Sequence, residues 1–151
     1  MILEHIGLTV SDLNRSIEFY QHVLGFAVLR KTTTNAYLHL DDQLLELTQC
    51  RAPADVSLPD TDPAWSERMY CTAGVAHLGF CVDDMDEAVE AMRRLGCTLI
   101  TPPFEFEPRI EYAAEPSQEK LRRATRPVGK PCWKLAMLSD PDGIILELVE
   151  R

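Results

Sequence analysis

Four side chains of this sequence have the chemistry of metal ligands, and each stands among apolar residues. His5 lies in ILEHIGLTV, His77 in VAHLGFCV, Glu46 in LLELT and Glu147 in IILELV. In an extended segment neighbouring side chains point to opposite faces, so each polar side chain lies opposite an apolar stripe. An ionised carboxylate in such surroundings costs several kcal/mol unless it is paired or metal-bound. A shared divalent cation removes that cost, and we therefore predict a metal site.

This set of nitrogen and oxygen donors indicates a class of metal ion and of reaction, but it does not select one metal. Imidazoles and carboxylates together suit Zn, Ni, Co, Mn or Fe(II). A divalent ion with open positions can hold two adjacent oxygens of a small-molecule substrate and stabilise an enediolate formed by loss of a proton. A carboxylate at the site can remove that proton and return it elsewhere. We predict Glu147 as this catalytic base, with Glu46 as the second candidate.

An internal repeat places the four residues at equivalent positions. The segment HIGLTVSDLNRSIEFYQHVLG at 5–25 corresponds to HLGFCVDDMDEAVEAMRRLG at 77–96, and LDDQLLELTQ at 40–49 resembles LSDPDGIILELVE at 138–150. His5 then matches His77, and Glu46 matches Glu147. The repeat predicts one unit over 1–50 and a second over 74–151, joined by a linker over 51–73 that is rich in Pro and Asp.

Each unit is predicted to carry one amphipathic helix. Asp12 and Asp84 are suitable N-caps, and Gly25 and Gly96 stand where a helix ends in a left-handed residue. The spacing of apolar residues predicts a buried stripe on each helix. The stripes are Leu13, Ile17, Tyr20 and Leu24 in the first helix, and Met85, Val89, Met92 and Leu95 in the second.

Strands complete a βαβββ pattern in both units, which predicts an α+β fold. The predicted strands are 2–10, 26–32, 35–40 and 43–49 in the first unit, and 75–82, 97–101, 132–138 and 144–150 in the second. The second unit also carries an insertion at 101–131. Long loops in compact domains are usually functional or disordered. We therefore interpret the insertion as a lid or wall over the site, or as a surface addition without a function.

Composition and charge narrow the function classes. The chain is 46% hydrophobic and 26% charged, with a formal net charge of -9, which disfavours nucleic acid as a partner. A local basic cluster is either a solvated face or a docking point for an anionic substrate tail; it comprises Lys120, Arg122, Arg123, Arg126 and Lys130. The sequence has no apolar run long enough to span a membrane and five cysteines without framework spacing. We expect a cytoplasmic chain with reduced thiols and no membrane partner.

The paired βαβββ units, the segment HIGLTVSDLNRSIEFYQHVLGF and the ending DPDGIILELVE resemble the glyoxalase/bleomycin resistance/dioxygenase (vicinal oxygen chelate) superfamily. The resemblance implies two half-barrels that form a cup around a divalent metal ion. It also implies that the ligands come from the first and last strands of each unit, which here carry His5, Glu46, His77 and Glu147. Family members often form homodimers, and some assemble each cup from two chains, so we expect a homodimer.

The ligand set is most similar to that of glyoxalase I, or lactoylglutathione lyase, which implies a metal-dependent lyase or isomerase. Glutathione-using bacterial members tend to have an arginine beside this ligand, but HIGLTV has none. The resemblance therefore does not establish glutathione as the thiol of the substrate. One alternative is an epimerase of the methylmalonyl-CoA type or another metal-dependent member, including a dioxygenase. A second alternative is a metal-free protein that binds a drug or metabolite, similar to the bleomycin resistance proteins.

Overall fold

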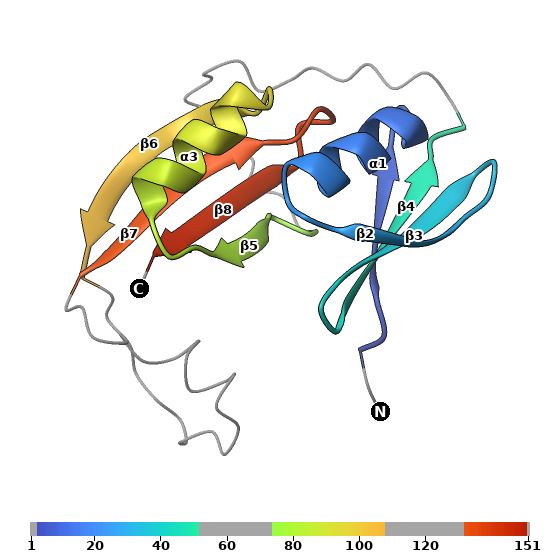
Figure 1. Cartoon of the computed structure of the whole chain (residues 1–151), viewed down its shortest axis with the longest axis horizontal. Coiled ribbons are helices and arrows are strands. Elements are labelled where there is room, and N and C mark those ends of the chain that lie inside the picture. The colour runs from blue at the N-terminus through green and yellow to red at the C-terminus, as the bar shows by residue number, and fades with distance from the viewer. Residues whose placement is uncertain (1–2, 52–73, 108–131, 151) are drawn as a thin grey trace.

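The computed structural model of the chain describes residues 3–51, 74–107 and 132–150, and it consists of two four-stranded sheets, each covered by a helix (Figure 1). The first unit contains β1 (Ile6–Val10), α1 (Leu13–His22), β2 (Ala27–Lys31), β3 (Asn35–Leu40) and β4 (Gln43–Gln49). The second contains β5 (Leu78–Cys81), α3 (Met85–Arg94), β6 (Thr98–Phe106), β7 (Trp133–Ser139) and β8 (Ile145–Glu150). The predicted α+β class with two βαβββ units is confirmed. No helix in the described ranges is long and apolar enough to cross a membrane.

The strand order places the first and last strands of each unit side by side. The orders are β1-β4-β3-β2 and β5-β8-β7-β6, with β1 parallel to β4 and β5 parallel to β8. The remaining neighbours are antiparallel. Parallel neighbours need a crossover connection, and the helix of each unit begins that connection. The segments that carry the candidate ligands are therefore adjacent within each sheet.

The helices begin and end where the sequence predicts. The Asp12 side chain accepts a hydrogen bond from the backbone N–H of Arg15 at 3.0 Å, and Asp84 accepts one from Glu87 at 2.9 Å. Gly25 follows the first helix with a φ of 75°, a left-handed conformation that favours glycine. The apolar stripes are buried as predicted except at their last residues, which lie beyond the helix ends. Leu24 is partly buried, and Leu95 is 51% exposed.

The core lies between each helix and the helix-facing side of its sheet. Alternate residues of the central strands, Ala36 and Leu38 in β3 and Ala136 and Leu138 in β7, are fully buried. Leu45 and Leu47 flank Glu46 in β4 and are also buried. Since side chains alternate along a strand, Glu46 points to the face of the sheet away from α1, as predicted. Glu147, between the buried Leu146 and Leu148, has the equivalent orientation.

The end of β6 and the starts of β1 and β5 differ from the predicted ranges. β6 extends to Phe106 although the predicted strand stops at 101, because an edge strand tolerates Pro102 and Pro103 at the cost of an irregular register with β7. His5 and His77 lie just before β1 and β5 rather than inside the strands. Most of the predicted linker and most of the predicted insertion lie outside the described residues.

A turn between β7 and β8 joins the two units. The Tyr20 hydroxyl of α1 donates a hydrogen bond to Asp140 at 3.1 Å, and Asp140 is 2% exposed. Asp140 also accepts the backbone N–H groups of Asp142 and Ile144 at 2.8 Å, which fixes the turn. Burial is the main cause that raises the pKa of Asp140 to about 6.

The buried Asp140 predicts a specific dependence of stability on pH. Its folded pKa lies above the ordinary value of 3.8, so its contribution to stability is complete below about pH 3.8 and is lost as pH rises through about 6. Relative to Asp140→Asn, the wild type should lose about 2–3 kcal/mol of unfolding free energy between pH 4 and 7. Urea unfolding across that range measures this difference. The exposed Asp83→Asn variant is the control, and parallel profiles for wild type and Asp140→Asn would contradict the prediction.

Candidate metal centre

Glu46 is positioned by the register of three strands. It lies opposite Gly7 of β1 on one side and opposite Tyr37 of β3 on the other. A Cβ atom at Gly7 would lie 3.7 Å from Oε2 of Glu46, so a longer side chain there would take the space of the carboxylate. The absence of a side chain at Gly7 therefore leaves room for Glu46 to reach towards His5.

The first histidine and glutamate form a pair with the spacing of metal ligands. Nε2 of His5 lies 3.4 Å from Oε2 of Glu46, and the two side chains are 31% and 20% exposed. Two donors that each lie about 2.1 Å from one ion are separated by about 3.0–3.4 Å in octahedral or tetrahedral geometry. This pair therefore fits two coordination positions of a divalent ion.

The second pair repeats this arrangement with a shorter separation. Nε2 of His77 lies 2.7 Å from Oε2 of Glu147, which is a hydrogen-bond distance. Nδ1 of His77 is buried and has no hydrogen-bond partner among the described residues, whereas Nδ1 of His5 contacts Glu4. The Glu147 carboxylate is therefore a polar contact that orients the His77 ring.

The structure brings together each histidine with its own glutamate but does not bring all four residues together. One pair belongs to the sheet of β1 and β4, and the other belongs to the sheet of β5 and β8. No group of three or more potential metal ligands occurs within residues 3–51, 74–107 and 132–150. In the described part of a single chain, the four candidate ligands therefore form two half-sites, each with one histidine and one glutamate.

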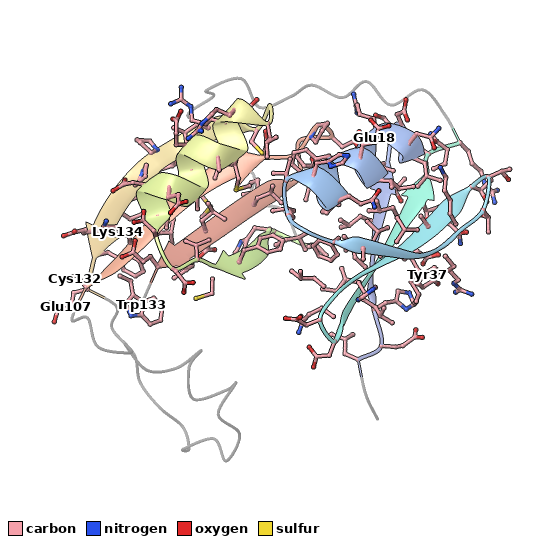
Figure 2. The ribbon with its side chains drawn as sticks, in the orientation of Figure 1. Glu18, Tyr37, Glu107, Cys132, Trp133 and Lys134 are labelled. Atoms are coloured by element: carbon pink, nitrogen blue, oxygen red, sulfur yellow. The ribbon has the colours of Figure 1, made fainter. Side chains whose placement is uncertain are left out.

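Three residues that the sequence analysis missed surround the first half-site. Nδ2 of Asn35 donates a hydrogen bond to Oε1 of Glu46 at 3.0 Å, which leaves Oε2 directed at His5. The Tyr37 ring packs edge-on against His5 with a centroid distance of 5.4 Å, and it lies on the side of the sheet away from α1 (Figure 2). The Arg30 guanidinium lies 3.9 Å from the centre of the Tyr37 ring. The two-residue alternation that placed Glu46 could also have placed Asn35 and Tyr37 on this face.

The family model of the glyoxalase/bleomycin resistance protein/dioxygenase superfamily matches residues 2–148. The chain belongs to this superfamily. The match includes all four candidate ligands and both βαβββ units, so the resemblance drawn from the repeat is confirmed. Membership of the superfamily does not select one reaction, because its relatives differ in their chemistry.

Relatives of this superfamily member include two enzyme types. The chain is 26% identical over 152 residues to a lactoylglutathione lyase of Escherichia coli O157:H7, covering 100% of this chain and 93% of that protein. It is 34% identical over 94 residues to a catechol-2,3-dioxygenase of Bacillus subtilis, covering 60% of this chain but only 30% of the length of that protein. The solved structure of a glyoxalase family protein from Enterococcus faecalis has a TM-score of 0.62 and 24% sequence identity to this chain. The match covers 99% of this chain and 97% of that chain, so the two proteins share a fold.

Proposed function

We propose that this protein is a divalent-metal-dependent lyase or isomerase of the glyoxalase I type, acting on a small hemithioacetal-like substrate. The observation that carries the proposal is the pair of equivalent His–Glu half-sites, His5 with Glu46 and His77 with Glu147. Lactoylglutathione lyases that match almost the full length of the chain support the same reaction. The catechol dioxygenase matches a smaller part of the chain and gives weaker support.

We propose further that a homodimer completes the metal centre. Each half-site supplies one imidazole and one carboxylate, and two such pairs make four ligands for Zn, Ni, Co, Mn or Fe(II). Because the two pairs of one chain belong to separate sheets, the first half-site of one copy would join the second half-site of the other copy. A C2 dimer of this kind contains two equivalent centres.

The chain's own residues have separate roles in this proposal. The ion, when bound, would polarise two adjacent substrate oxygens and so acidify the neighbouring C–H group. Glu147 removes the proton from that carbon and returns it to the adjacent carbon, with His77 at 2.7 Å orienting its carboxylate. Oε1 of Glu46 accepts a hydrogen bond from Asn35, while Oε2 faces His5. Glu46 would therefore act as a ligand, and Glu147 would act as both ligand and base.

Complementation between two inactive variants tests the reaction and the shared site together. His5→Ala and His77→Ala should each lose metal and hemithioacetal isomerisation as homodimers. In a heterodimer of the two variants, one centre contains both substitutions and the other contains neither. The purified heterodimer should therefore recover about half of the wild-type metal content and activity, since one of two equivalent centres is intact.

The outcomes separate the two parts of this proposal. If the heterodimer stays inactive while the wild type is active, the ligands of each centre do not come from two copies. If the wild type loaded with each of the five metals isomerises no hemithioacetal, the lyase assignment is wrong. Parallel assays of acyl-CoA epimerisation and catechol ring cleavage then identify the alternative reaction.

A further inference from the structure

One row of residues crosses the whole first sheet and ends at a cation. The register pairs Gly7 with Glu46, Glu46 with Tyr37, and Tyr37 with Arg30, through β1, β4, β3 and β2 in that order. Residues that are paired across a sheet share a face, so Arg30 lies on the same side as the candidate ligand Glu46. The neighbouring Lys31 points the other way, because its Nζ donates a hydrogen bond to Asn14 of α1 at 2.7 Å.

Direct contacts connect Arg30 to the first half-site. Its guanidinium lies on the Tyr37 ring at 3.9 Å, and the same ring packs against His5 at 5.4 Å. A guanidinium on an aromatic face is held in orientation by a cation–π contact while its N–H groups stay available. Among the described residues, no carboxylate forms an ion pair with Arg30, and its side chain is exposed to solvent. Its hydrogen-bonding edge is therefore open to a ligand.

The equivalent row of the second sheet carries no charge beside its glutamate. There the register pairs Gly79 with Glu147, Glu147 with Met137, and Met137 with Thr101. Met137 replaces Tyr37, and Thr101 replaces Arg30. Both units thus contain a His–Glu pair. The residues that follow the glutamate in the row are aromatic and cationic in the first unit but neutral in the second.

We propose that Arg30, positioned by Tyr37, is the subsite for a carboxylate of the substrate. This inference rests on the proposed function and adds a substrate class: a molecule with chelating oxygens in the middle, a carboxylate on one side and a neutral group on the other. The planar guanidinium can donate two parallel hydrogen bonds to a carboxylate, which makes it selective for that group. Arg30 is a specificity-determining residue that does not take part in the proton transfer.

Hydroxamates with a tail of two to six methylene groups, ending in a carboxylate or in its methyl ester, test the subsite. A hydroxamate chelates a divalent ion through two adjacent oxygens, and the two tail ends differ in charge. Calorimetry on the Ni²⁺-loaded and the metal-free protein should show, for the best tail length, at least about tenfold tighter binding of the acid than of the ester. Arg30→Gln should remove this preference and leave ester binding unchanged.

Two further variants complete the design. Lys31→Gln removes a neighbouring positive charge from the opposite face and should keep the full preference for the acid. Arg30→Lys keeps the charge but loses the planar donor pair, so it should retain only part of the preference. Equal binding of acid and ester by the wild type, binding of neither, or equal effects of Arg30→Gln and Lys31→Gln would overturn the subsite. Hemithioacetal turnover is measured separately, so an inactive protein that prefers the acid refutes the lyase assignment and not the subsite.

Discussion

Glu147→Gln is expected to lower turnover by about 10²–10⁴-fold without unfolding the protein, provided that this carboxylate is the general base. The amide has nearly the same shape as the carboxylate but cannot accept a proton from the substrate carbon. Glu147 is flanked by the buried Leu146 and Leu148 and is itself partly exposed, so the substitution leaves the core packing intact. The loss should appear in kcat more than in KM, because the proton transfer belongs to the transition state.

Metal binding must be separated from catalysis in this experiment, since Glu147 is also a candidate ligand. Activity is therefore measured at saturating metal, and the bound metal is quantified on the same sample. Glu90→Gln, an exposed position on α3, is the matched control and should behave as the wild type. If Glu147→Gln retains activity within threefold of wild type with full metal content, Glu147 is not the base, and Glu46→Gln becomes the next variant to test.

Asp142→Ala is expected to lower the free energy of unfolding by about 3 kcal/mol, because Asp142 connects the turn between β7 and β8 to the first unit. Oδ1 of Asp142 accepts the backbone N–H of Ser11 at 3.0 Å, and Oδ2 accepts the Ser16 hydroxyl at 2.9 Å. Arg15 forms an ion pair with the same carboxylate at 3.0 Å, and the Asp142 side chain is only 4% exposed. Alanine leaves the buried Ser16 and the Ser11 N–H without an acceptor, and each such orphaned donor costs about 1–3 kcal/mol.

Urea unfolding at pH 7 measures this loss, with Asp83→Ala as an exposed control that should change stability by less than about 0.5 kcal/mol. Asp142→Asn keeps one acceptor oxygen and should give an intermediate value. A loss below about 1 kcal/mol for Asp142→Ala would show that water replaces the carboxylate at this junction. Arg15→Ala should cost much less than Asp142→Ala, because the Arg15 side chain is 48% exposed and its ion pair is screened by solvent.

The repeat made the fold, and the equivalent positions of the two histidines and the two glutamates, predictable from the sequence. Two-residue alternation around Glu46 and Glu147 correctly placed both carboxylates on the face away from the helices. The predicted ranges of β3 and β4 match the structure, because short turns bound those strands closely. The caps at Asp12 and Asp84 were predictable because capping depends on a local hydrogen bond.

Other features depend on contacts between distant segments, which a sequence pattern does not contain. Arg30 could be linked to His5 only through the register of β2 with β3 and through the Tyr37 ring. The role of Asp142 depends on the approach of the β7–β8 turn to α1, across more than a hundred residues of chain. The division of the four candidate ligands into two half-sites follows from the separation of the sheets, which the repeat alone does not specify.

The pairing of β1 with β4, and of β5 with β8, means that each half of the chain carries its own donors. Each histidine meets a glutamate of its own unit, so one βαβββ unit needs no residue of the other unit to bring an imidazole and a carboxylate together. The residues beside the two pairs can therefore differ without separating the donors, as Arg30 and Tyr37 in the first unit differ from Thr101 and Met137 in the second.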